Sequence, residues 1–154
     1  NTYVWVGAVA GGELRSGGVG RTFYWEKEGP LYSISTYRVT ATVTPHLIKT
    51  GGLGARVQGM RRYYALLLDR AGTIRLVKAL DGERVLAEKP FPVEFDAPVD
   101  LALEVCGDKI RGFAGDTLLF DVRDTDQPFD GGGVALLVED GRLECGPVRV
   151  VPLA

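Results

Sequence analysis

The sequence has few of the residues that build metal sites or nucleophilic sites. Its 154 residues include one His, two Cys and three Ser. A structural zinc site takes four Cys or His ligands, and this chain alone cannot supply them. The three Ser lie outside any Gly-x-Ser-x-Gly sequence, and the single His, His46, follows Pro45 in a turn-like stretch. The composition therefore gives no indication of a zinc protein or of a Ser-His-Asp hydrolase.

Excess positive charge and long apolar runs are also missing. The 18 Lys and Arg are outnumbered by 20 Asp and Glu, which gives a formal net charge of −2. Nucleic-acid and anionic-membrane binders carry a concentrated basic patch, so the charge argues against both partners. No apolar run approaches the roughly 18 residues that a membrane-spanning helix needs.

Asn, Gln and Met are rare, with one Asn, two Gln and one Met. Scarcity of these residues is typical of thermophilic proteins, and a GC-rich genome produces the same bias. The chain begins at Asn1. We expect one domain over residues 1–154, belonging to a longer chain. Cys106 and Cys145 are expected to be free thiols, although both fall near predicted strand ends, where a disulfide is geometrically allowed.

What the chain does contain is strong period-two alternation. In residues 37–44, the apolar Tyr37, Val39, Ala41 and Val43 alternate with Arg and Thr, which predicts a half-buried strand that ends at Pro45. Asp-Gly and Gly-Asp pairs separate further runs of this kind, and such pairs favour hairpin turns because primed turns need positive φ. The further predicted strands are 63–69, 73–80, 83–88, 99–106, 109–114, 117–123, 134–139 and 142–151.

A hairpin corner every 8–12 residues predicts an all-β protein, built as an antiparallel sandwich or barrel. We expect at most a single helical turn, over residues 45–49. In the N-terminal third, residues 3–9 and 22–25 are predicted as short strands, and the Gly-rich residues 11–20 as a loop. Residues 124–133 are predicted as a second long loop.

Several of these runs resemble the concanavalin A-like lectin/glucanase superfamily in its laminin-G-like jelly-roll form. The similarity covers Gly54 to Val150, about two-thirds of the chain. It rests on residues 54–59, the 63–68 run Tyr-Tyr-Ala-Leu-Leu-Leu, the hairpins 74–87 and 99–113, and the closing segment 117–136.

The resemblance implies a jelly roll, an antiparallel two-sheet β-sandwich. It also implies a module of the kind appended to carbohydrate-active enzymes, to bacterial ADP-ribosylglycohydrolase-like proteins and to secreted adhesins. Glucanase members carry a Glu-x-Asp-x-x-Glu strand, whereas here Glu94-Phe95-Asp96 is followed by Ala97-Pro98 and lacks the third acid. This departure argues against glycoside hydrolysis, which needs two carboxylates across the sugar.

Aromatic and arginine side chains are the main candidates for ligand binding, because sugars pack on aromatic faces while planar donors bind their hydroxyls. Tyr63 and Tyr64 must point to opposite faces of a strand, so at most one of them belongs to the core. Phe113 shares a strand face with Arg111 and is expected at the surface. The predicted ligand-binding residues are Trp25, Arg56, Arg62, Tyr63 and Phe113.

Three acidic residues of the loop at 124–133 suggest a calcium site as one reading. Asp124, Asp126 and Asp130 could offer hard carboxylate oxygens, but the bidentate Glu of an EF-hand is absent. Aspartates also favour turns because they cap local backbone amides, so turn formation is the competing reading. We expect no cofactor otherwise.

The sequence thus leads to a non-catalytic accessory module that binds carbohydrate or a sugar-containing ligand such as a glycoconjugate. A structural module that docks on an adjacent catalytic domain of the same chain is the first alternative. A glycoside hydrolase is the second.

Overall fold

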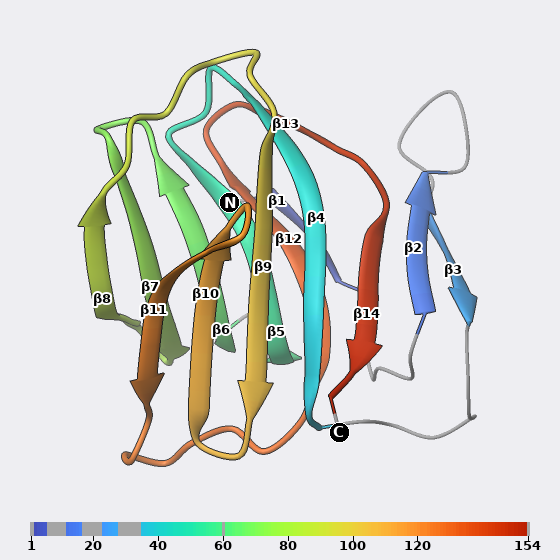
Figure 1. Cartoon of the computed structure of the whole chain (residues 1–154), viewed down its shortest axis with the longest axis vertical. Coiled ribbons are helices and arrows are strands. Elements are labelled where there is room, and N and C mark those ends of the chain that lie inside the picture. The colour runs from blue at the N-terminus through green and yellow to red at the C-terminus, as the bar shows by residue number, and fades with distance from the viewer. Residues whose placement is uncertain (1, 6–11, 17–22, 28–34, 60, 154) are drawn as a thin grey trace.

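Two antiparallel sheets lie face to face in the computed structural model of the chain (Figure 1). The structure describes residues 35–59 and 61–153 in full, and the backbone of residues 2–5, 12–16 and 23–27. These residues form fourteen strands. No helix among them is long and apolar enough to cross a membrane.

The six-stranded sheet has the order β1-β12-β5-β6-β7-β8. Neighbouring strands distant in sequence, such as β12 and β5, show the crossovers of a jelly roll. The bounds are β1 (Thr2–Trp5), β5 (Thr50–Gly59), β6 (Arg62–Asp69), β7 (Thr73–Leu80), β8 (Glu83–Pro90) and β12 (Gly133–Glu139).

The eight-stranded sheet faces the viewer in Figure 1 and has the order β11-β10-β9-β4-β14-β2-β3, with β13 also paired to β4. The bounds are β2 (Gly12–Ser16), β3 (Phe23–Lys27), β4 (Tyr37–His46), β9 (Val99–Cys106), β10 (Lys109–Ala114), β11 (Thr117–Arg123), β13 (Arg142–Cys145) and β14 (Val148–Pro152).

The core lies between the sheets and follows from the period-two alternation. On β4 the four predicted inward residues, from Tyr37 to Val43, are at most 5% exposed, whereas the alternate residues face outward. They join one cluster with Tyr64, Leu66 and Leu68 of β6, in the opposite sheet. The all-β sandwich expected from the sequence is therefore confirmed.

The predicted Asp-Gly turns are also confirmed. Asp81 and Gly82 have φ of 52° and 149°, and Asp140 and Gly141 have φ of 50° and 144°. Gly141 is required for a second reason: a Cβ there would lie 2.3 Å from the carbonyl oxygen of Leu47. The β12–β13 turn thus packs directly on the bend between β4 and β5.

Three local predictions were wrong. β4 continues through Pro45 to His46, although the sequence predicted that the strand ends at Pro45. Pairing with β9 ends at Val43, so among the described strands Pro45 pairs with β13 alone and breaks no central ladder. Strand β2 lies inside the predicted loop 11–20, and the single strand predicted over 142–151 is divided into β13 and β14.

Candidate functional site

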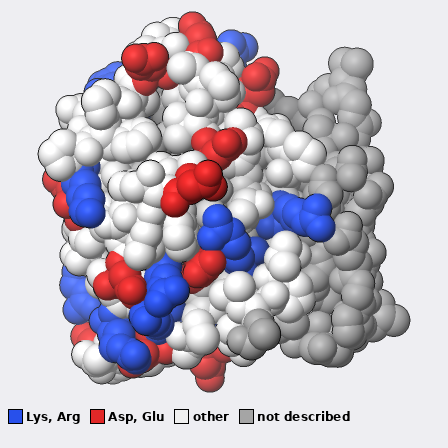
Figure 2. All heavy atoms as spheres, viewed as in Figure 1, with Lys and Arg blue, Asp and Glu red and all other residues white. Residues whose placement is uncertain are grey.

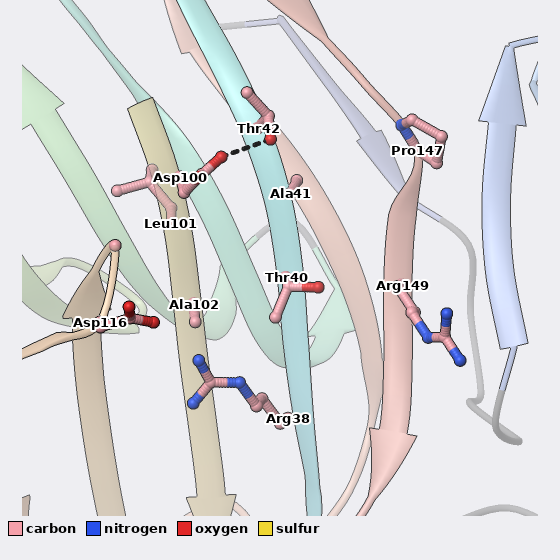
Figure 3. Close-up of a pocket in the computed structure, with 11 residues that line it drawn as sticks. Arg38, Thr40, Ala41, Thr42, Asp100, Leu101, Ala102, Asp116, Pro147 and Arg149 are labelled. Atoms are coloured by element: carbon pink, nitrogen blue, oxygen red, sulfur yellow. Dashed lines mark hydrogen bonds between the residues drawn. The ribbon is translucent and has the colours of Figure 1, made fainter. Parts of the chain in front are cut away.

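A pocket of about 460 Å³ opens on the outer face of the eight-stranded sheet (Figure 3). It spans β9, β4 and β14 and is bordered by the β10–β11 turn and the β13–β14 connection. The lining residues are Arg38, Thr40, Ala41, Thr42, Asp100, Leu101, Ala102, Gly115, Asp116, Pro147 and Arg149.

The pocket is hollow at its centre because two small side chains face outward side by side and form its floor. Thr40 of β4 pairs with Ala102 of β9, and on this face larger or charged pairs lie at either end of them. Thr42 pairs with Asp100 on one side, and Arg38 pairs with Glu104 on the other. The alternation that builds the core also places these polar residues outward.

Two loops form the walls, and backbone hydrogen bonds tie both loops to the floor strands. The Gly115 amide donates to the Asp100 carbonyl over 2.8 Å, which draws the β10–β11 turn toward β9. The Gly146 amide donates to the Thr42 carbonyl over 2.9 Å, which draws the β13–β14 connection toward β4. The hollow is therefore fixed by backbone geometry.

Arg38 is held in place at the edge of the pocket. Its Nη1 lies 2.8 Å from a Glu104 oxygen, and its guanidinium carbon lies 4.5 Å from the centre of the Phe113 ring. Such an ion pair and cation–π contact restrict a long flexible side chain to one orientation. Figure 2 shows basic and acidic side chains gathered across this face, where Arg111 also pairs with Asp121 at 3.4 Å.

Two carboxylates complete the polar lining. The Thr42 hydroxyl donates to Asp100 Oδ1 over 2.5 Å. Asp116, at the tip of the β10–β11 hairpin, has no hydrogen-bond or ion-pair partner in the part of the chain that the structure describes. In Figure 3 the side chains of Asp116 and Arg38 both point toward the space over Ala102.

The structure brings one predicted ligand-binding residue to this pocket. Phe113 pairs with Ala102 in the sheet and is half-buried beneath Arg38. Arg62 and Tyr63 lie on the other sheet, at the start of β6, where Tyr63 packs on a small cluster that includes Ala65 and Val77. Trp25 belongs to β3, whose side chains lie outside the described residues.

Arg56 is 1% exposed and lies between the sheets. Its guanidinium donates to the carbonyls of Ser35, Gly107 and Phe129, at 2.8 Å for Ser35 and 2.6 Å for Phe129. Its backbone amide donates to the Tyr37 hydroxyl over 2.7 Å. Burial raises the pKa of Tyr37 to about 12, so this hydroxyl stays protonated. In this setting Arg56 joins loops to the core and presents no free donor edge to solvent.

The three aspartates of the predicted calcium loop do not converge. Asp124 is 2% exposed, and its Oδ2 lies 2.6 Å from Lys78 Nζ and accepts a 2.6 Å hydrogen bond from the Tyr64 hydroxyl. Burial opposes ionisation of Asp124, but the hydrogen bonds from Lys78 and Tyr64 outweigh it and lower the pKa of the carboxyl. Asp126 pairs with Arg84 at 3.3 Å, and Asp130 is exposed. Within the described residues no group of three His, Cys, Asp or Glu could hold a metal.

The remaining candidates from the sequence do not form a catalytic group. Glu94 and Asp96 lie in the connection between β8 and β9, not on a strand, and Asp96 contacts the His46 ring. Cys106 and Cys145 are free thiols, as expected.

Sequence reasoning missed the pocket residues, chiefly Arg38, Thr40, Asp100 and Asp116. Each one is an ordinary polar residue on an outward strand position or in a turn. The available signal was the small Ala102 between Asp100 and Glu104 on an otherwise polar face.

Many solved structures have a fold similar to that of this chain. Neither a protein-family model nor a curated protein sequence matches the chain. Among solved structures, the carbohydrate binding module CBM66 from Bacillus subtilis aligns with a TM-score of 0.71 and 18% identity, over 97% of this chain and 91% of that one. The galectin LEC-6 from Caenorhabditis elegans aligns with a TM-score of 0.59 and 14% identity, over 76% and 83%.

A longer protein shows the same fold as part of a larger chain. The GH43 protein BlXynB from Bacillus licheniformis aligns with a TM-score of 0.60 and 14% identity, over 98% of this chain but only 32% of that one. At such identities the likeness defines the fold alone. The chain has a jelly-roll β-sandwich fold like that of these structures, as the resemblance in sequence implied.

Proposed function

We propose that this chain is a non-catalytic accessory module that binds carbohydrate in the pocket over β4 and β9. The observation that carries the proposal is a walled hollow lined by fixed donors and acceptors on the outer face of a jelly-roll sheet. The structurally similar proteins named as a carbohydrate binding module and a galectin support it by analogy.

The chemistry of the lining suits a polyol. Sugar hydroxyls donate and accept at once, and the pocket offers carboxylates from Asp100 and Asp116 beside the guanidinium of Arg38 and the hydroxyl of Thr40. A volume of about 460 Å³ lies within the usual range for small-ligand sites.

The absence of catalysis is part of the proposal. A glycosidase acid is kept protonated by an apolar, desolvated environment. Asp100 and Asp116 are both exposed to water, and Asp100 also accepts a hydrogen bond from Thr42. These carboxylates suit hydrogen bonding to a ligand better than proton donation to a leaving group.

The accessory role completes the proposal: residues 1–154 act as one domain attached to an adjacent domain of a longer chain. The GH43 protein, of which the aligned part is only 32%, gives a precedent for this arrangement. The net charge of −2 supports neither nucleic acid nor a membrane as partner.

A glycan array followed by titration calorimetry on the full 154-residue chain tests the proposal. We expect saturable binding to at least one glycan, lost in Thr40→Tyr, which fills the pocket, and kept in Thr73→Tyr, the same change at a half-buried site of the other sheet. No binding across a broad glycan set by a cooperatively folded chain would contradict the proposal. Binding that survives Thr40→Tyr but is lost in Arg62→Ala or Tyr63→Ala would move the site to the six-stranded sheet.

One observation favours the alternative of a module that docks on a neighbouring domain. Leu47, in the bend after β4, is 76% exposed, and Phe95, in the β8–β9 connection, is 40% exposed. The Asp96 amide donates to the Pro45 carbonyl near the end of β4 over 2.8 Å, which ties this connection to β4. If these side chains meet an adjacent domain, Leu47→Ser and Phe95→Ser lower the melting temperature of the complete parent protein but not of the isolated chain. Equal effects in both would exclude docking at this end.

A further inference from the structure

The hydrogen-bond donors and acceptors that line the pocket indicate which class of sugar it binds. Resting on the proposed function, we infer that it takes a neutral, hydroxyl-rich sugar and discriminates against sugars that carry a carboxylate. Asp116 and Asp100 accept hydrogen bonds from the sugar hydroxyls, and Arg38 donates to them.

Charge balance in the lining is the first argument. Among the described residues, the basic side chains of the lining are Arg38 and Arg149, and Asp100 and Asp116 balance their charge. Glu104 adds a further negative charge beside the pocket, 2.8 Å from Arg38. A site for an anion concentrates positive charge, whereas these groups leave none in excess.

The state of Arg38 is the second argument. Tight carboxylate recognition uses the paired N–H groups of a free guanidinium fork. In Arg38 one nitrogen is already bonded to Glu104, and the guanidinium lies over the Phe113 ring. The orientation of Arg38 is therefore set by Glu104 and Phe113, and its remaining N–H groups are fixed donors that suit the lone pairs of a hydroxyl.

The two aspartates supply the third argument. An ionised carboxylate only accepts hydrogen bonds, so a partner of Asp116 or Asp100 must donate. A sugar hydroxyl donates to the aspartate and still accepts from Arg38. A ligand carboxylate cannot donate, and it would be repelled by both aspartates in the same pocket.

Aromatic stacking contributes little to this recognition. The described lining contains no aromatic residue, and Arg38 covers the face of Phe113, the aromatic side chain beside it. Selection therefore depends on the positions of hydroxyl groups, with Phe113 and Glu104 acting through Arg38 as positioning residues.

The test compares matched ligands on the full chain. The probes are neutral hexose oligosaccharides and the same oligosaccharides with their C6 hydroxymethyl groups oxidised to carboxylates, measured by titration calorimetry at low salt. We expect the neutral member of a pair to bind at least tenfold more tightly. Tighter binding of the oxidised member overturns this inference and leaves the proposed function standing, whereas no binding of either member, with a broad array also blank, removes both.

A charge-removing variant separates the inference from a general loss of binding. Asp116→Asn is expected to weaken neutral-sugar binding about tenfold or more and to narrow the neutral-over-acidic preference, because an acceptor and a repelling charge are lost together. The matched control is Asp81→Asn, an exposed turn aspartate of the other sheet, for which we expect affinity within twofold of the parent. An unchanged preference in Asp116→Asn contradicts the assignment, since the variant side chain is exposed and should not disturb folding.

Discussion

Replacement of Lys78 by Met removes one charge from the most buried ion pair in the described structure. The side chains of Lys78 and Asp124 are only 3% and 1% exposed, and their charged atoms lie 2.6 Å apart. Lys78 also donates to the carbonyls of Asp126 and Gln127. The substitution therefore leaves a buried carboxylate without its main cation and frees two loop carbonyls.

The expected cost is about 3 kcal/mol in free energy of unfolding, at the lower end of the range for breaking a buried pair. It falls at that end because Asp124 keeps the Tyr64 hydroxyl at 2.6 Å and the Asp126 amide at 3.1 Å. The double variant Lys78→Met with Asp124→Leu removes both charges and is expected to cost only about 1–2 kcal/mol, mainly from the unpaired Tyr64 and amide groups.

Urea unfolding at pH 7 measures these differences. Lys49→Met is the control, because its pair with Glu139 at 3.2 Å is half-exposed and should contribute less than about 1 kcal/mol. A loss below about 1 kcal/mol for Lys78→Met, or a double variant less stable than Lys78→Met alone, would contradict the expected cost of breaking this buried pair.

Acid titration of stability gives an independent check on the same pair. The pKa of Asp124 is lower in the folded state than in the unfolded chain, where Asp titrates near about 3.9. Its contribution is therefore fully present above roughly pH 4 to 5 and is lost as pH falls toward the depressed folded value. We expect the parent to lose more stability than Lys78→Met over this acid range, because the variant has already lost the interaction that lowers the pKa. An equal loss of stability in the parent and in Lys78→Met over this pH range would contradict the expected role of the pair.

Three further substitutions test other parts of the account. Phe113→Leu should weaken glycan binding severalfold by releasing Arg38, while Phe113→Tyr restores it; equal affinity in all three proteins, measured by calorimetry, would exclude the positioning role. Gly141→Ala should lower stability by about 2 kcal/mol or more in thermal unfolding, because its φ is 144° and a Cβ would lie 2.3 Å from the Leu47 carbonyl oxygen; an unchanged melting temperature would contradict the close approach. Arg56→Met should cost about 3 kcal/mol in urea unfolding, because three carbonyls lose their donor, and a loss typical of surface sites would show that water replaces the guanidinium.

The strands were predictable because local pattern and tertiary burial agree over most of the chain. The alternation in residues 37–43 and the Asp81-Gly82 and Asp140-Gly141 turns each specify their local geometry without long-range information. The outer and inner faces of β10 were predicted correctly for the same reason: Ile110 and Gly112 are buried, and Phe113 faces outward, where Arg38 covers its ring.

Elsewhere, strand pairing between residues distant in sequence determined the structure, against the local sequence preferences. Residues 12–16, within the predicted Gly-rich loop 11–20, form β2 because β14 and β3 supply strand partners on both sides. Pro45 was expected to stop a strand, yet it lies beyond the last β9 partner and its missing amide breaks no bond there.

The pocket could not be predicted because it has no local signature. Its lining comes from four segments, 38–42, 100–102, 115–116 and 147–149, which meet only after the sheet has formed. The ligand-binding residues predicted from the sequence were chosen because they are aromatic or arginine residues. Among those whose side chains the structure describes, Arg56 is used inside the fold and Phe113 lies beside the pocket.

Mapping of backbone amide shifts by NMR, during titration of the full chain with the neutral glycan that binds best, tests the location of the site most directly. We predict that the largest shifts fall on Thr40, Ala102, Gly115 and Gly146, around the floor and walls of the pocket. Saturable shifts confined to Arg62, Tyr63 and their neighbours on the six-stranded sheet would contradict it.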